Sequence, residues 1–314
     1  MKNRPGNALF PSAPSFALRV LMILTFGALF MSDILPPSGD VQIRELIAWP
    51  LDSYVYRDRA MSRQQLAAAS ERAAAVLSPY NNFIPALDAH LTRDLRPLLS
   101  EHLSRPDLLH EYAGFDWTLG VVDLYQLLAF QRRLVLDPTD AHDPLPGPDD
   151  WPALLHFALN GSRSTACTHS IQQYTAHRIE LTLRSTNPDL KLQPTTDASL
   201  PFSIALSGGT PFFEVAKLEG RWFLRDGYHR AYRLLRAGCR FTVAVVLRVD
   251  SIAELGAVQP WFFSEVDLRS ERPPRVVDFL DDRLTLTYSR PRLLKTLRIH
   301  IEESLEPIQT GEQL

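Results

Sequence analysis

The chain has little cysteine, little glycine and little net charge. Its 314 residues include two cysteines, 14 glycines against 24 prolines, and a formal net charge of −3. Cys167 and Cys239 are too few for a disulfide framework and too far apart in sequence for a zinc knuckle. The small net charge gives no indication of a nucleic-acid coat or a polybasic membrane binder. The excess of proline over glycine indicates stiff connections between several short elements.

The remaining composition is that of an ordinary globular protein. Apolar residues make up 45% and charged residues 22% of the chain, and a chain of this length buries one large core or two modest ones. The scarcity of cysteine favours a reducing compartment, so we expect a cytoplasmic protein. Cys239 is expected to be a small buried side chain at a helix end rather than a nucleophile.

The N-terminal segment is open to more than one interpretation. An apolar run covers residues 16–31 and superficially resembles a signal peptide. Arg19 interrupts the run, no small-x-small cleavage site follows, and the uninterrupted part is only about half a membrane span. We therefore expect no stable membrane span. Residues 1–40 are treated as a leader, disordered or preceding the true start, with a signal or anchor and a structured element as the alternatives.

Residues 41–160 are predicted to form a helical region that offers a docking face to a protein partner. Ser62 is a plausible cap for a helix over 62–77, which is rich in strong helix formers. Apolar residues recur at helical spacing over 84–103 and 119–134. A further short helix, Trp151 to Leu159, is expected after an exposed connection.

Residues 161–314 are predicted to form a small mixed sheet with helices, so the fold class is α+β. A helix is expected from Gly227 to Ala237. The expected strands are Arg178–Leu192 with a break at Asn187-Pro188, Phe212–Leu218, Arg221–Leu224, Phe241–Val249, Leu284–Tyr288 and Leu297–Ile301.

The turn between Arg221–Leu224 and the following helix is the stretch best suited to bind a ligand. The apolar strand runs into Asp226-Gly227, and a helix starts at once. Backbone N–H groups at the positive end of a helix dipole favour an anion, so a phosphate-bearing ligand is expected. Gly227 lets the backbone approach that ligand closely, and Asp226 is predicted to cap the helix.

The predicted helix has an apolar face and a basic face. Between Lys217 and Arg248 there are eight lysines or arginines and two acids. Such a concentration suits a polyphosphate or a nucleic-acid backbone, although a solvated helix face is the alternative. The packing face is predicted to hold Ala231, Leu234, Leu235 and Gly238, and the basic face His229, Arg233, Arg236 and Arg240.

The run Phe-Leu-Arg-Asp-Gly-Tyr-His-Arg-Ala, with the helix and apolar strand after it, resembles the nucleotide-binding box of the ParB/sulfiredoxin superfamily. Members carry Gly-Glu-Arg-Arg in partition proteins, Gly-Cys-His-Arg in sulfiredoxins and Asp-Gly-His-Thr-Arg in a free-serine kinase branch. Asp226-Gly227 and Arg230-Ala231 make the kinase-like form the nearest. The resemblance covers residues 200–249, about a sixth of the chain.

The resemblance implies a site for ATP or CTP, with Mg²⁺ as an accompanying ion. Nucleotide-binding residues would be Gly227, Tyr228, His229, Arg230 and Arg233. Asp226 and His229 would take catalytic roles in a phosphotransferase or NTP hydrolase, with Asp226 assisting a metal ion or a substrate hydroxyl and His229 stabilising transferred charge. Tyr228 either stacks on a base or packs beneath the helix.

Departures from the family pattern reduce the number of functions that the resemblance implies. Tyr228 stands where sulfiredoxins have cysteine, so repair of peroxiredoxin by that chemistry is not expected. No helix-turn-helix pair is visible after Val249, which counts against DNA partition. Glu214 is one candidate for the general base of a kinase, and a structural charge at a strand edge is its alternative.

Other candidate residues carry weaker signals. The loop 207–210 lacks the lysine and the spacing of a phosphate loop and is expected to be a plain turn. His156, His169 and His177 have no recognised metal spacing, so no metal is assigned to them. Trp261-Phe262-Phe263 is expected in the core. Three functions stay open: a nucleotide-binding protein, a nucleic-acid-associated regulator that uses the basic helix, and a non-catalytic interaction protein with a vestigial box.

Overall fold

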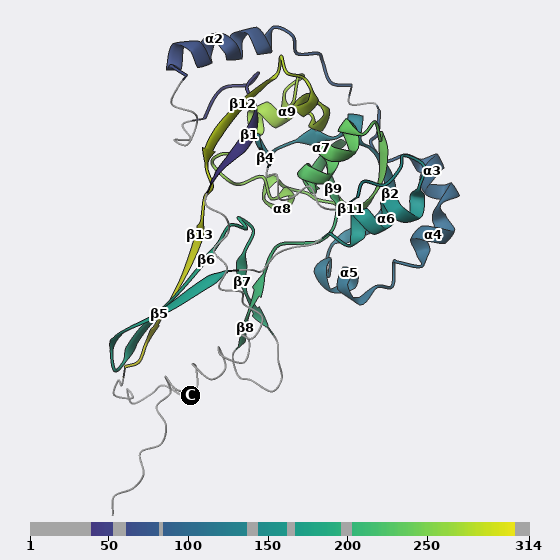
Figure 1. The fold of residues 1–314 in the computed structure, drawn as a ribbon. Coiled ribbons are helices and arrows are strands. Elements are labelled where there is room, and N and C mark those ends of the chain that lie inside the picture. Colours follow the sequence, from purple (N-terminus) through teal and green to yellow (C-terminus); the bar gives the residue numbers. More distant parts are fainter. Residues whose placement is uncertain are drawn as a thin grey trace, which may run out of the picture. The chain divides into compact units, whose positions relative to one another are not determined.

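A computed structural model describes residues 39–52, 61–81, 84–136, 144–161, 167–195 and 203–304 (Figure 1). The described chain is a mixed α+β structure with several small sheets. It divides into a larger unit, Ser38–Arg163 with Gly209–Arg292, and a smaller unit that includes Ser164–Gly208 and the chain from Leu293 onward. The apolar run 16–31 of the expected leader lies outside the described residues.

The larger unit is built on a mixed five-stranded sheet in the order β2-β11-β9-β10-β3. Its strands are β2 (Asp116–Asp123), β3 (Leu128–Ala129), β9 (Glu214–Leu218), β10 (Arg221–Asp226) and β11 (Phe241–Arg248). The central strand β9 runs parallel to β11 and antiparallel to β10. From β9 the chain therefore passes to its hairpin partner β10, then through a helix to the parallel strand β11. This is the order of elements that the sequence predicts.

A second, antiparallel sheet of the larger unit has the order β12-β1-β4. Its strands are β1 (Asp40–Leu46), β4 (Arg133–Leu136) and β12 (Thr285–Pro291), and two 3₁₀ helices, η2 (Leu124–Gln126) and η4 (Val276–Leu280), lie nearby in the chain. Ile43 of β1 is in register with Tyr288 on one side and Val135 on the other. These side chains form a small apolar cluster of their own.

Helices flank these sheets. They are α2 (Arg63–Ala74), α3 (Ala89–Asp94), α4 (Arg96–Ser100), α5 (Pro106–Glu111), α6 (Trp151–Leu159), α7 (Tyr228–Arg236), α8 (Ile252–Leu255) and α9 (Glu265–Arg269). The predicted start of α2 is confirmed: the Ser62 side chain accepts a hydrogen bond from the Gln65 backbone, and the Gln65 side chain accepts one from Ser62 in return. Within the described ranges, no helix has both the length and the apolar character needed to cross a bilayer.

The prediction of a helix over residues 119–134 is wrong. This segment contains most of β2, the short η2 helix, β3 and the start of β4. Leu119, Val121 and Val122 are all buried, because β2 lies inside the larger unit. A strand that is buried on both faces shows a continuous apolar run, and such a run does not differ from a buried helix in its periodicity. The predicted helical region 41–160 therefore carries strands β1 to β4 beside its helices.

The face of α7 that packs into the core is largely as predicted. Ala231, Leu234 and Leu235 are buried in the main apolar cluster. Gly238 departs from the prediction, because it is exposed and adopts a left-handed conformation with φ of 81° just after the helix. It ends the helix rather than packing it. Cys239 follows as a buried free thiol, as expected.

The smaller unit is formed by β-strands alone within its described residues. The antiparallel sheet β13-β6-β5 contains β5 (Thr168–Thr175), β6 (Arg178–Ser185) and β13 (Lys295–Glu302), and β7 (Lys191–Thr195) pairs with β8 (Ser203–Ser207). Leu181, Leu183 and Leu190 form its core with Cys167. The predicted strand break at residues 187–188 is confirmed.

Candidate functional site

The candidate site lies where β10 turns into α7. In the pairing of β9 with β10, Leu224 faces Val215 and Asp226 faces Glu214, so that Arg225 is an extra residue in the ladder. Gly227 then adopts a left-handed conformation with φ of 99°, and α7 begins at Tyr228. The bulge and the left-handed glycine turn the chain from strand to helix within a few residues. We call residues 226–230 the corner.

Gly227 is buried, and its backbone lies against an aromatic ring. A β-carbon at position 227 would stand 2.7 Å from Cδ2 of Phe213. Two separate features thus require glycine here: the positive φ and the close approach of the ring. The corner is therefore closed on the side of Phe213.

Asp226 does not cap α7, and that prediction is wrong. The N-cap residue is Gly227, and the helix has no side-chain cap hydrogen bond. One carboxylate oxygen of Asp226 accepts a hydrogen bond from the Gly227 backbone N–H instead. The left-handed glycine places Asp226 one residue too early to reach the N–H groups of the first turn. Its carboxylate still stands beside the helix N-terminus.

Tyr228 packs beneath the helix, which is one of its two predicted roles. Its hydroxyl accepts hydrogen bonds from the backbone N–H groups of Phe130 at 3.0 Å and Gln131 at 3.3 Å. Its ring meets that of Phe130 edge to face at a centroid distance of 5.9 Å. Burial raises the pKa of the Tyr228 phenol. The residue therefore anchors α7 to the segment between β3 and β4.

Arg230 binds main-chain oxygens from two other segments. Its guanidinium donates to the carbonyls of Phe157 and Ala158 in the last turn of α6, and to those of Pro211 and Phe212 just before β9. The last carbonyls of a helix have no intrahelical donors and lie at the negative end of its dipole, so a cation is favourable there. Arg230 thus holds α6 and the start of β9 against α7.

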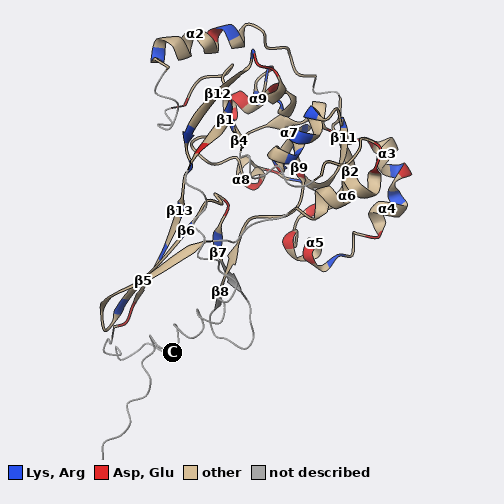
Figure 2. Cartoon of the chain, in the orientation of Figure 1, with Lys and Arg blue, Asp and Glu red and all other residues tan. Residues whose placement is uncertain are grey.

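The basic face predicted on α7 is narrower than expected. His229 and Arg236 are exposed and Arg233 is half-buried, whereas Arg240 forms two hydrogen bonds of 3.0 and 2.7 Å with one carboxylate oxygen of Asp123. Figure 2 shows basic residues along α7. His229, Arg233 and Arg236 lie at positions i, i+4 and i+7 of the predicted basic face, and Arg240 is the member of it that pairs with Asp123.

Glu214 lies in the central strand β9, so the edge position expected for it as a structural charge is wrong. The Glu214 carboxylate is 1% exposed and accepts hydrogen bonds from the Tyr112 hydroxyl at 2.8 Å, the Thr210 hydroxyl at 2.5 Å and the Arg225 guanidinium at 2.6 Å. Burial raises the pKa of Glu214, and the Arg225 charge opposes that shift. The carboxylate beside the corner is thus surrounded by donors from this chain.

Sequence reasoning missed Tyr112 and Arg225 as members of this cluster. Tyr112 is 102 residues from Glu214 in the chain and follows the short helix α5, so no local pattern connects the two. Arg225 carries a weak signal, since it immediately precedes Asp226-Gly227. A bulge that turns its side chain toward β9 cannot be foreseen from composition.

The other candidate residues fall outside the corner. In the loop 207–210, Thr210 binds Glu214 and Gly209 has a φ of 93°, which is compatible with the predicted turn. No group of histidine, cysteine, aspartate and glutamate suited to a metal ion occurs among the described residues. Phe263 is buried as expected, but Trp261 is 42% exposed, so the prediction of a fully buried aromatic run is wrong for that residue.

Comparisons of this chain with protein-family models, with curated proteins and with solved structures found no match.

Proposed function

We propose that the protein binds the phosphates of a nucleotide, ATP or CTP, at the first turn of α7. The observation that carries this proposal is the start of that helix: α7 leaves a left-handed Gly227 with no side-chain cap and no acidic residue in its first turn. The positive end of the dipole thus has no carboxylate of its own turn to neutralise it. The exposed His229 is the first side chain that a ligand meets there.

In this proposal the residues of the box take different roles from those that the resemblance implies. The first-turn N–H groups, His229 and Arg233 contact phosphate. Arg230 is a positioning residue, because its guanidinium is bonded to four carbonyls of α6 and the chain before β9. Tyr228 anchors the helix, and Gly227 permits the turn.

Because of the Asp226 carboxylate, nucleotide binding at this helix end is expected to require a cation. It lies beside the same helix end and would repel a bare polyphosphate. Mg²⁺ is commonly held by one or two carboxylates together with substrate phosphates. Asp226 fits that pattern, and we assign it to the metal ion of a bound nucleotide. His229 would stabilise charge on a transferred phosphoryl group.

A titration of the full chain tests this function. We expect heat of binding with ATP or CTP in the presence of Mg²⁺, and weaker heat with inorganic tripolyphosphate, which lacks the base and ribose. Arg233→Ala should weaken the binding, whereas Arg248→Ala should not, because Arg248 is an exposed arginine on β11, away from α7. No heat with any of the three ligands at millimolar concentration would contradict the proposal.

One observation favours a second candidate, a non-catalytic interaction protein. Gly227, Tyr228 and Arg230 all have packing roles within this chain. Those roles account for three residues of the box without any ligand. A protein partner that is captured equally well by the wild type and by a nucleotide-blind variant would support this candidate.

A further inference from the structure

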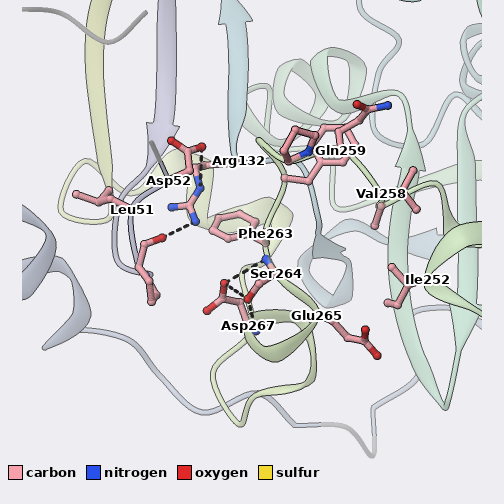
Figure 3. Close-up of a pocket in the computed structure, with 14 residues that line it drawn as sticks. Leu51, Asp52, Arg132, Ile252, Val258, Gln259, Phe263, Ser264, Glu265 and Asp267 are labelled. Carbon is pink, nitrogen blue, oxygen red and sulfur yellow. Dashed lines mark hydrogen bonds and ion pairs between the residues drawn. The ribbon is translucent and has the colours of Figure 1, made fainter. Parts of the chain in front are cut away.

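A separate pocket lies elsewhere in the larger unit, with a volume of about 620 Å³ (Figure 3). It is lined by residues 50–52, by Arg132 and by residues between Ile252 and Asp267, and no residue of the corner is among them. Volumes of 300–1,000 Å³ are typical of pockets for small ligands. The pocket is therefore large enough for a ligand and independent of the proposed nucleotide site.

Eight of the fourteen residues that line the pocket are apolar, and the other six are polar or charged. Leu51 lies on one side, and Ile252 and Val258 lie on the opposite side in Figure 3. Phe262 and Phe263 add two aromatic rings, which meet that of Phe130 or Trp49 edge to face. Such walls favour a ligand with an apolar body.

Arg132 contributes the positive charge of the lining, but its donors are directed into the protein. It is 2% exposed, donates to the carbonyls of Leu46 at 3.3 Å and Pro50 at 2.7 Å, and its Nε lies 3.9 Å from a carboxylate oxygen of Asp52. Its guanidinium also stands 4.2 Å from the ring centroid of Phe263. These contacts leave Arg132 poorly placed to bind an anion in the pocket.

Carboxylates outnumber cations among the residues that line the pocket. Asp52, Glu265 and Asp267 are present against the single guanidinium of Arg132. Asp52 also accepts a hydrogen bond of 2.8 Å from Arg133, and Asp267 accepts hydrogen bonds from the backbone and hydroxyl of Ser264. Glu265 is half exposed and pairs with Arg269. Carboxylates are therefore the commonest charged groups of the lining, and two of the three, Asp52 and Glu265, also pair with arginines outside it.

We propose that this pocket binds an organic cation, a primary ammonium or guanidinium group carried on an apolar chain. The cationic head would lie near Glu265 and Asp267, and the chain would lie along Ile252, Val258 and Phe262. Free amines and lysine side chains of a peptide share this chemistry. Cadaverine and agmatine represent the first source, and N-acetyl-lysine methylamide represents the second.

The test is a titration of the full chain with these three probes. Val258→Trp fills the pocket from a residue that is 61% exposed, and Val266→Trp is its matched control, since Val266 is 79% exposed and does not line the pocket. We expect affinity to fall about tenfold or more, at least about 1.4 kcal/mol, in Val258→Trp. It should stay unchanged in Val266→Trp. Glu265→Gln should weaken binding about threefold, the size of an exposed charge pair.

The outcomes separate cleanly. Binding that follows this pattern supports the proposal. Tighter binding of cadaverine or agmatine would identify free amines as the ligand, and tighter binding of the lysine analogue would identify a peptide lysine. Three results would overturn it: no probe binding at millimolar concentration, equal affinity in the two tryptophan variants, or displacement of the probe by acetate or phosphate at constant ionic strength. Unchanged melting temperatures of the unliganded variants establish that each variant is folded.

Discussion

The ring of Phe213 lies against the backbone of Gly227, so closely that a β-carbon at position 227 would stand 2.7 Å from the ring. Gly227→Ala should therefore destabilise the protein for two reasons, the left-handed φ and the clash. Gly220→Ala is the matched control, because Gly220 also has a positive φ but has open space where a β-carbon would be. We expect about 1–2 kcal/mol for the control and a larger loss at position 227. Chemical denaturation measures the free energy of unfolding of both variants. Equal losses would show that the Phe213 ring moves aside at no cost in stability.

Arg230 is expected to contribute to stability, whatever the protein binds. Arg230→Ala removes the donor from four carbonyls of α6 and the chain before β9, and should cost about 2–3 kcal/mol. Arg236→Ala, at an exposed position of the same helix, should change the free energy of unfolding by less than about 0.5 kcal/mol. Urea titrations of the two variants would separate them. Equal stabilities would mean that the Arg230 contacts add nothing.

Glu214 should make stability depend on pH. Its pKa is raised above the ordinary value of 4.5 by burial, so the folded state retains a proton that the unfolded chain releases first. Stability from this group is complete below about pH 4.5 and is lost as pH rises through the folded-state pKa. Glu214→Gln cannot titrate, so it should gain stability relative to the wild type over that interval.

Unfolding free energies between pH 4 and 7.5 check this expectation, and each unit of upward shift adds about 1.4 kcal/mol to the difference. Glu219→Gln is the control, because Glu219 is an exposed carboxylate on the same hairpin. Its pH profile should match that of the wild type. A Glu214→Gln profile parallel to the wild type would contradict the raised pKa.

Asp226 should link nucleotide binding to Mg²⁺. Without the ion, its carboxylate repels phosphate at the start of α7, so Asp226→Asn should bind ATP or CTP more tightly than the wild type in EDTA. Adding Mg²⁺ should raise the nucleotide affinity of the wild type but not that of Asp226→Asn. Titrations with and without the ion measure this. An unchanged dependence on Mg²⁺ would remove Asp226 from the site.

The order of β9, β10, α7 and β11 could be predicted because each boundary has a local chemical cause. Glu219 and Gly220 both adopt positive φ in the hairpin turn, and Gly227 supplies the left-handed residue before the helix. The contacts of these elements could not be predicted in the same way. Arg230 meets carbonyls 72 and 73 residues earlier in the chain, and these contacts arise only from tertiary packing.

The pocket was hidden from sequence reasoning for a related reason. Arg132 lies in the segment 119–134, where the apolar spacing predicts a helix, whereas the structure gives short strands. Its partners Asp52 and Phe263 come from distant parts of the chain. The sequence around Arg132 therefore does not indicate that this residue is buried or that it lines a pocket.

The most direct test of the proposed function is the melting temperature of the full chain with Mg²⁺ and ATP or CTP. The wild type should melt at a higher temperature with at least one nucleotide, since a ligand that binds only the folded state stabilises it. A His229→Ala, Arg233→Ala double variant should show no rise with nucleotide above its own melting temperature without ligand. A wild type whose melting temperature is unmoved by millimolar nucleotide, or a double variant that rises equally, would contradict phosphate binding at the start of α7.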